Sequence, residues 1–89
     1  MAANMEVTFK YFAWVRERIG VGEERATLPE TVSTVADAIS WLKQRGDGYA
    51  AAFEREEIIR AAVDQTHAPH SAPLKGAQEI AFFPPITGG

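Results

Sequence analysis

Hydrophobic residues occupy every second position in residues 6–11 and again in residues 24–28. A period of two is typical of a β-strand that buries one face. The second stretch ends at Pro29, which lacks the backbone N–H that a continuing strand would use. We therefore predict two strands and expect them to form an antiparallel pair.

Residues 12–19, between these strands, follow a helical period instead. Phe12, Val15 and Ile19 fall on one face of a helix, and Gly20 is a typical helix stop. The pattern predicts a short helix that buries these three side chains.

A longer helix is predicted after Thr34, which forms a variant of the capping box with Asp37. Gly46 is expected to close the segment. Trp41 lies on the flank of this helix, where we expect it to cover the edge of the core. The hydrophobic positions that repeat at helical spacing are Val35, Ala38, Ile39 and Leu42.

The second half of the chain predicts one helical turn at residues 49–53 and strands at residues 58–63 and 79–83. Residues 66–76 contain two prolines and a glycine, which predicts a loop with room for one short edge strand. One amphipathic helix on one face of a mixed sheet is an α+β arrangement in two layers.

Composition limits the function classes. The chain has 89 residues, a formal charge of −3 and no cysteine. This length supports one compact domain, and the charge argues against nucleic acid and anionic membranes as partners. The absence of cysteine excludes disulfides, thiolate metal sites and a cysteine nucleophile. With no apolar stretch near 20 residues and no signal-like N-terminal pattern, we expect a cytoplasmic protein.

Side chains that could carry chemistry are few. His67 and His70 are three residues apart, but nothing nearby completes the three or four ligands that zinc needs. We interpret both as solvent-exposed loop histidines, and we expect no metal site. Residues 54–57 are interpreted as a solvated acidic surface. No nucleophile motif surrounds any of three serines, Ser33, Ser40 and Ser71.

The C-terminal segment is different, because the last predicted strand continues directly into Phe-Pro-Pro-Ile-Thr-Gly-Gly. Consecutive prolines favour an extended path, so the segment should project from the sheet. Gly88 and Gly89 have no Cβ and can enter a narrow channel. The carboxylate that follows them is ionised at neutral pH. We predict a domain over residues 1–83 and an extended tail over residues 84–89.

These residues resemble a known family. The segment 80–89, Ile-Ala-Phe-Phe-Pro-Pro-Ile-Thr-Gly-Gly, closely resembles the C-terminal signature of the small, sulfur-carrier subunits of molybdopterin synthase. These are ubiquitin-like β-grasp proteins. Weaker similarity covers most of the remaining chain and includes residues 7–20, 34–39 and 73–76. Where the family often has an asparagine after the third strand, this chain has Asp64.

The resemblance implies a mixed sheet packed on one main helix, with the first and last strands as central neighbours. It also implies that an ATP-dependent activating enzyme adenylates the carboxylate of Gly89. A sulfur donor would then convert that group into a thiocarboxylate, which gives sulfur to cyclic pyranopterin monophosphate. On this reading the chain is a non-catalytic subunit that binds no cofactor. Its partners are the activating enzyme, which uses ATP, and a large subunit in a heterotetramer.

The same resemblance implies roles along the tail. Gly88 and Gly89 are the transferring end, and strand alternation should leave Phe83 outward as an anchor for a partner. The residues of the stalk between them are Pro84, Pro85, Ile86 and Thr87.

Two other functions share the activation chemistry. A ubiquitin-like protein modifier would end with Gly89 joined to target lysines. A sulfur carrier for another pathway, such as thiamine synthesis, would load the same end. A binding module with an incidental Gly-Gly end would need no activation at all.

Overall fold

The computed structural model describes residues 4–85 of the chain. Within this part the strands form one mixed sheet in the order β2-β1-β5-β3-β4. The strands are β1 (Met5–Tyr11), β2 (Glu23–Leu28), β3 (Arg60–Val63), β4 (Thr66–Ala68) and β5 (Glu79–Phe83). The helices are α1 (Ala13–Ile19), α2 (Val35–Lys43), α3 (Asp47–Ala52) and the 3₁₀ helix η1 (Glu56–Ile58).

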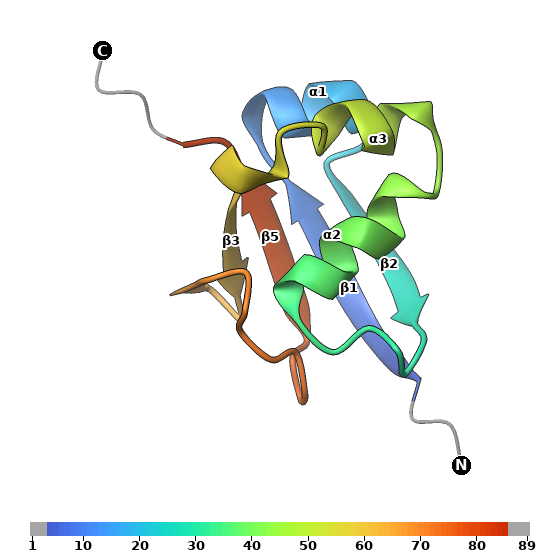
Figure 1. Cartoon of the computed structure of the whole chain (residues 1–89), viewed down its shortest axis with the longest axis vertical. Helices are drawn as coiled ribbons and strands as arrows, with labels where there is room; N and C mark the ends of the chain where they lie inside the picture. The colour runs from blue at the N-terminus through green and yellow to red at the C-terminus, as the bar shows by residue number, and fades with distance from the viewer. Residues whose placement is uncertain (1–3, 86–89) are drawn as a thin grey trace.

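The first and last strands are neighbours at the centre of the sheet. β1 pairs with β5 in parallel, with Thr8 opposite Glu79 and Tyr11 opposite Phe82. β2 pairs with β1 in antiparallel fashion, as predicted, and β3 does the same with β5. Figure 1 shows α2 crossing one face of the sheet, with α1 and α3 at the end where β1 and β5 finish. This arrangement confirms the predicted β-grasp fold.

The main helix begins where its cap predicts. The side chain of Thr34 accepts a hydrogen bond from the backbone N–H of Asp37, and the Asp37 carboxylate accepts one from Thr34 N–H, both at 3.2 Å. Ser33 donates to the same carboxylate through its backbone and its hydroxyl, which is the main reason that the pKa of Asp37 lies below its ordinary value. The helix ends at Lys43, slightly before the predicted stop at Gly46.

The core lies between α2 and the sheet. Phe9 sits at its centre, with its ring centroid 6.0 Å from that of Phe82 and 6.4 Å from that of Trp41. Trp41 is half-buried and packs on the flank of the helix, as predicted. The fully buried side chains of α2 and the central strands include Val7, Phe9, Tyr11, Val35, Ala38, Ile39, Leu42, Ile80 and Phe82.

Phe12 is the main correction to the predicted core. The sequence pattern places Phe12 on the buried face of α1, but its side chain is 48% exposed. The helix begins one residue later, at Ala13, and Phe12 is its extended N-cap with φ −128° and ψ 155°. Ala13 itself has a φ of 53°, in the left-handed region that L residues seldom adopt. Phe12 therefore belongs to neither the strand period nor the helix period.

The predicted third strand and loop are also refined. The strand predicted over residues 58–63 starts only at Arg60, because Ile58 belongs to the 3₁₀ helix. Asp64 and Gln65 have φ values of 50° and 71°, the left-handed pair that allows a two-residue hairpin turn. This turn leads into β4, the short edge strand for which the predicted loop left room.

Within residues 4–85, no helix is long and apolar enough to cross a membrane.

Gly48 allows α3 to pack closely against α1. A Cβ at this position would lie 2.6 Å from the carbonyl oxygen of Arg18, which is closer than real Cβ atoms approach. We expect Gly48→Ala to lower the free energy of unfolding by about 1–3 kcal/mol, because the two helices must separate. Urea denaturation followed by circular dichroism measures this loss.

Gly46→Ala is the matched control. A Cβ on Gly46 would meet its nearest atom, in the Tyr49 ring, at an ordinary 3.8 Å. We expect a loss of only about 0.5 kcal/mol, from the poorer helix cap. If both variants lost the same free energy of unfolding, the close approach of Gly48 to Arg18 would not limit the packing of α3 against α1.

Candidate functional site

The candidate site is the point where β5 leaves the sheet and the Pro-Pro segment begins. Phe83 is the last residue of β5 and pairs with Arg60 of β3. Pro84 and Pro85 follow outside any helix or strand, and both are half-buried. Phe83 and these two prolines are called the stem base below. Ile86, Thr87, Gly88 and Gly89 lie outside the described residues, so their predicted roles stay predictions.

Phe83 is less exposed than its predicted role as an outward anchor suggests. Its side chain is half-buried, and its ring meets that of His67 edge to face, with centroids 5.4 Å apart. On the face of the sheet opposite α2, His67 pairs with Ala62, and Ala62 pairs with Ala81. Because Ala62 on the intervening strand β3 is small, the imidazole can reach across it to the phenyl ring. Phe83 is therefore held in place while part of its ring stays accessible.

Phe12 is a second aromatic residue at this end of the sheet. Its backbone N–H donates to the carbonyl oxygen of Phe82 at 3.1 Å, which places Phe12 next to the strand that leads into the stem base. It is one of two large hydrophobic residues that are clearly exposed among residues 4–85; the other is Val21. Sequence reasoning missed Phe12. The sequence signal that could have identified it is its position between the strand alternation of residues 6–11 and the helical spacing that follows.

A hydrogen-bond network stiffens the sheet beneath the stem base. Glu24 on β2 accepts hydrogen bonds from the hydroxyl groups of Tyr11, at 2.8 Å, and Tyr49, at 2.7 Å. Arg45 forms an ion pair with the same carboxylate at 3.3 Å. The Tyr11 ring also stacks on that of Phe82, with centroids 6.5 Å apart. The network thus joins β1, β2 and α3 at the end of the sheet where the stem begins.

Tyrosine ionisation is suppressed in this network. Burial is the first cause, and the hydrogen bond to Glu24 and its negative charge add to it. Together they raise the pKa of Tyr11 well above its ordinary value. The pKa of Tyr49 is raised for the same reasons, in the same order.

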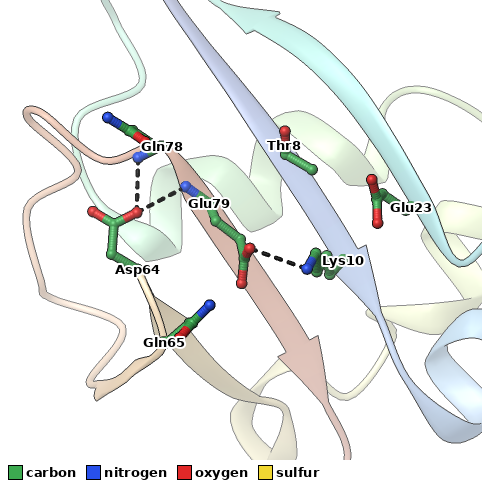
Figure 2. Close-up of a pocket in the computed structure, with 7 residues that line it drawn as sticks. All are labelled: Thr8, Lys10, Glu23, Asp64, Gln65, Gln78 and Glu79. Atoms are coloured by element: carbon green, nitrogen blue, oxygen red, sulfur yellow. Dashed lines mark hydrogen bonds and ion pairs between the residues drawn. The ribbon is translucent and has the colours of Figure 1, made fainter.

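A polar hollow lies at the other end of β5 (Figure 2). The Asp64 carboxylate accepts hydrogen bonds from the backbone N–H groups of Gln78 and Glu79, both at 2.9 Å. Lys10 forms an ion pair with Glu79 at 3.1 Å. The Asp64 carboxylate is thus bound to the backbone, and the charges of Lys10 and Glu79 are paired with each other. These contacts hold the start of β5 in place. Asp64, where the family often has asparagine, therefore has a structural role in this chain.

The two histidines differ from each other. The interpretation of both as solvent-exposed loop residues is wrong for His70, which is half-buried and donates from Nε2 to the carbonyl oxygen of Ile59 at 2.7 Å. His67 is exposed, but it lies on β4 and contacts Phe83. Across residues 4–85, no cluster of three or more metal-binding side chains is found.

The acidic segment and the serines take structural or surface positions. Glu56 and Glu57 form ion pairs at the surface with Lys43 and Arg55, both at 3.4 Å. Ser33 belongs to the cap of α2, and Ser40 and Ser71 are exposed.

One aromatic ring and two prolines make up the stem base, and Phe12 lies beside it. Such groups bind a partner through buried apolar area and do not transfer protons. The geometry of these residues therefore favours a surface that binds a partner.

Comparison with known proteins gives a consistent family. Residues 9–89 match the model of the ThiS family. The molybdopterin synthase sulfur carrier subunit of Haemophilus influenzae is 39% identical over 79 residues, which cover 89% of this chain and 94% of that protein. The subunit of the same name from Escherichia coli K12 is 38% identical over 81 residues, with coverage of 89% and 94%.

A solved structure agrees with this match. The structure from Pyrococcus furiosus described as a putative molybdopterin converting factor, subunit 1, is 30% identical, with a TM-score of 0.72. The similarity covers 92% of this chain and 99% of that one.

The raised pKa of Tyr11 predicts a loss of stability at alkaline pH. Because the folded state holds the phenol proton more tightly, this stabilisation is complete below about pH 10 and is lost as the pH rises further. One unit above the ordinary value, the loss should reach about 1.4 kcal/mol. Denaturant unfolding between pH 8 and 11 measures it.

Tyr11→Phe provides the comparison. We expect this variant to be less stable at pH 8 by about 1 kcal/mol, because Glu24 loses one donor, but to lose less stability above pH 10 than the wild type. Parallel curves for the two proteins would contradict the assignment to Tyr11.

Proposed function

The chain belongs to the ThiS family, and on that basis we propose that it is the sulfur carrier subunit of a molybdopterin synthase. Two proteins of that name share 38–39% identity with most of the chain. The one structural observation that carries the proposal is the position of the stem base. The central strand β5 passes directly into Pro84 and Pro85, and the sequence then runs to Gly88 and Gly89.

The chemistry requires activation from outside, because a carboxylate is a poor electrophile. An activating enzyme joins the carboxylate of Gly89 to the α-phosphate of ATP and releases pyrophosphate. The terminal sulfur of a persulfide donor then attacks the acyl carbon, the C–O bond to the phosphate breaks, and AMP leaves. A thiol of the donor system attacks the S–S bond of the resulting acyl disulfide, so that a disulfide forms on the donor and the carrier is released. The product end is a thiocarboxylate. Gly88 and Gly89 suit this step because the absence of Cβ atoms lets both enter a narrow active site.

This proposal assigns binding, and not catalysis, to the chain. The loaded end donates its sulfur inside the large subunit, to cyclic pyranopterin monophosphate. Two copies of each subunit form the heterotetramer. The accessible parts of Phe12 and Phe83 lie at the stem base, so the large subunit covers them when it takes up the tail. The chain itself holds no cofactor, and ATP is consumed by the activating enzyme.

The intact mass of the protein from cells tests the sulfur-carrier role. Replacement of one terminal oxygen by sulfur is the expected result. A ubiquitin-like modifier would instead give heavier conjugates that disappear when Gly89 is deleted. A protein without either product would contradict the proposal.

A change at the C-terminal end should block loading and leave the fold intact. One bulky residue added after Gly89 moves the reacting carboxylate away from the activating site. Gly88→Val should act in the same way, because its side chain obstructs a narrow channel. We expect no thiocarboxylate by mass spectrometry for either variant, with unchanged thermal denaturation. Normal loading of either would contradict the proposed role of this end.

The two aromatic residues at the stem base should carry affinity for the large subunit. We expect Phe12→Ala and Phe83→Ala each to weaken binding by about 1–3 kcal/mol, since each removes an apolar contact from the interface. Titration calorimetry measures the change.

Thr27→Ala is the control for these variants. Thr27 is exposed on the edge strand β2, opposite Glu6 and away from the stem base. We expect no change in affinity. If all three variants bind equally well, the large subunit does not cover the stem base.

A further inference from the structure

His67 has an unusual position for an exposed imidazole. It lies on β4, at the edge of the sheet, and its ring packs edge to face on Phe83 at the stem base. His67 belongs to a row of paired residues that crosses four strands of the sheet. The other members of this row are Ala62 on β3, Ala81 on β5 and Lys10 on β1. Phe83 lies in the neighbouring row, opposite Arg60, and the small side chain of Ala62 lets the imidazole reach the phenyl ring across β3. A partner that covers Phe83 must therefore also cover His67.

The second histidine provides a contrast within the same structure. His70 is half-buried, and its Nε2 is bound to the carbonyl oxygen of Ile59. In the described part of the chain, the ring of His67 makes no such hydrogen bond and packs edge to face on Phe83. The exposed ring of His67 is therefore solvated in the free protein.

Arg60 lies near His67, so a positive charge on His67 is disfavoured when a partner excludes water from this surface. His67 shares a shallow hollow with Arg60, Glu57 and His70. Arg60 lies opposite Phe83 and has no carboxylate partner within residues 4–85, whereas Glu57 is already paired with Arg55. A protonated His67 would therefore be buried beside an uncompensated guanidinium. Desolvation and like charge both oppose this state.

We propose that His67 makes docking at the stem base sensitive to protonation, so that the carrier binds its large subunit in the neutral imidazole form. The inference rests on the function proposed above. The neutral ring extends the apolar surface of Phe83, whereas the imidazolium must lose its proton or its hydration before the partner can close over it. An imidazole changes charge between about pH 5 and 8, so this dependence falls within the physiological range.

The test is the dissociation constant for the large subunit, measured at pH 8 and pH 6 with the full-length chain. For the wild type we expect binding about threefold or more weaker at pH 6. His67→Leu and His67→Gln should both lose this additional weakening, because neither side chain titrates. Any remaining dependence on pH then belongs to other groups of the two proteins.

His70→Gln is the control, because glutamine retains an N–H donor for Ile59 and removes only the other titrating imidazole. We expect it to keep the pH dependence of the wild type. Parallel pH profiles for the wild type and both His67 variants would overturn the inference and leave the proposed function intact. Absence of binding at both pH values, together with no thiocarboxylate on the wild-type chain, would overturn both.

Discussion

The parallel pairing of β1 with β5 is the constraint on which the rest of the structure depends. Parallel neighbours end at the same edge of a sheet, so β5 finishes where β1 passes into α1. The stem base therefore emerges beside Phe12, although more than 70 residues separate the two segments. An antiparallel pairing would have placed the prolines at the opposite end, next to the hairpin turn of Asp64 and Gln65.

The start of β5 is held by polar contacts, and near its end Phe82 stacks on Tyr11, which belongs to a hydrogen-bond network. Asp64 binds the first backbone N–H groups of the strand, and the network of Glu24, Tyr11 and Tyr49 lies beneath its last residues. Such a supported strand suits a surface that binds a partner. A partner that binds the stem base then loses little conformational entropy in ordering this surface.

The physical requirements of binding and reactivity are separated along the chain. Binding needs buried apolar area, which the rings at the stem base provide. In the proposed function, reactivity needs a slender and unhindered end, for which two glycines without Cβ atoms are suited. The edge strand β4 places His67 next to Phe83, in the part of the chain that we propose binds the partner.

Local patterns in the sequence determined the elements of this protein. The alternation in residues 6–11, the capping box of Thr34 and Asp37, and the Pro-Pro-Ile-Thr-Gly-Gly segment are all read from neighbouring positions, because each depends on short-range geometry. Only the tertiary structure decided the surroundings of the stem base. Phe12 is exposed as the extended N-cap of α1, and His67 reaches Phe83 because strand pairing sets the small Ala62 of β3 between the two strands. Such contacts join residues distant in sequence, and no local period encodes them.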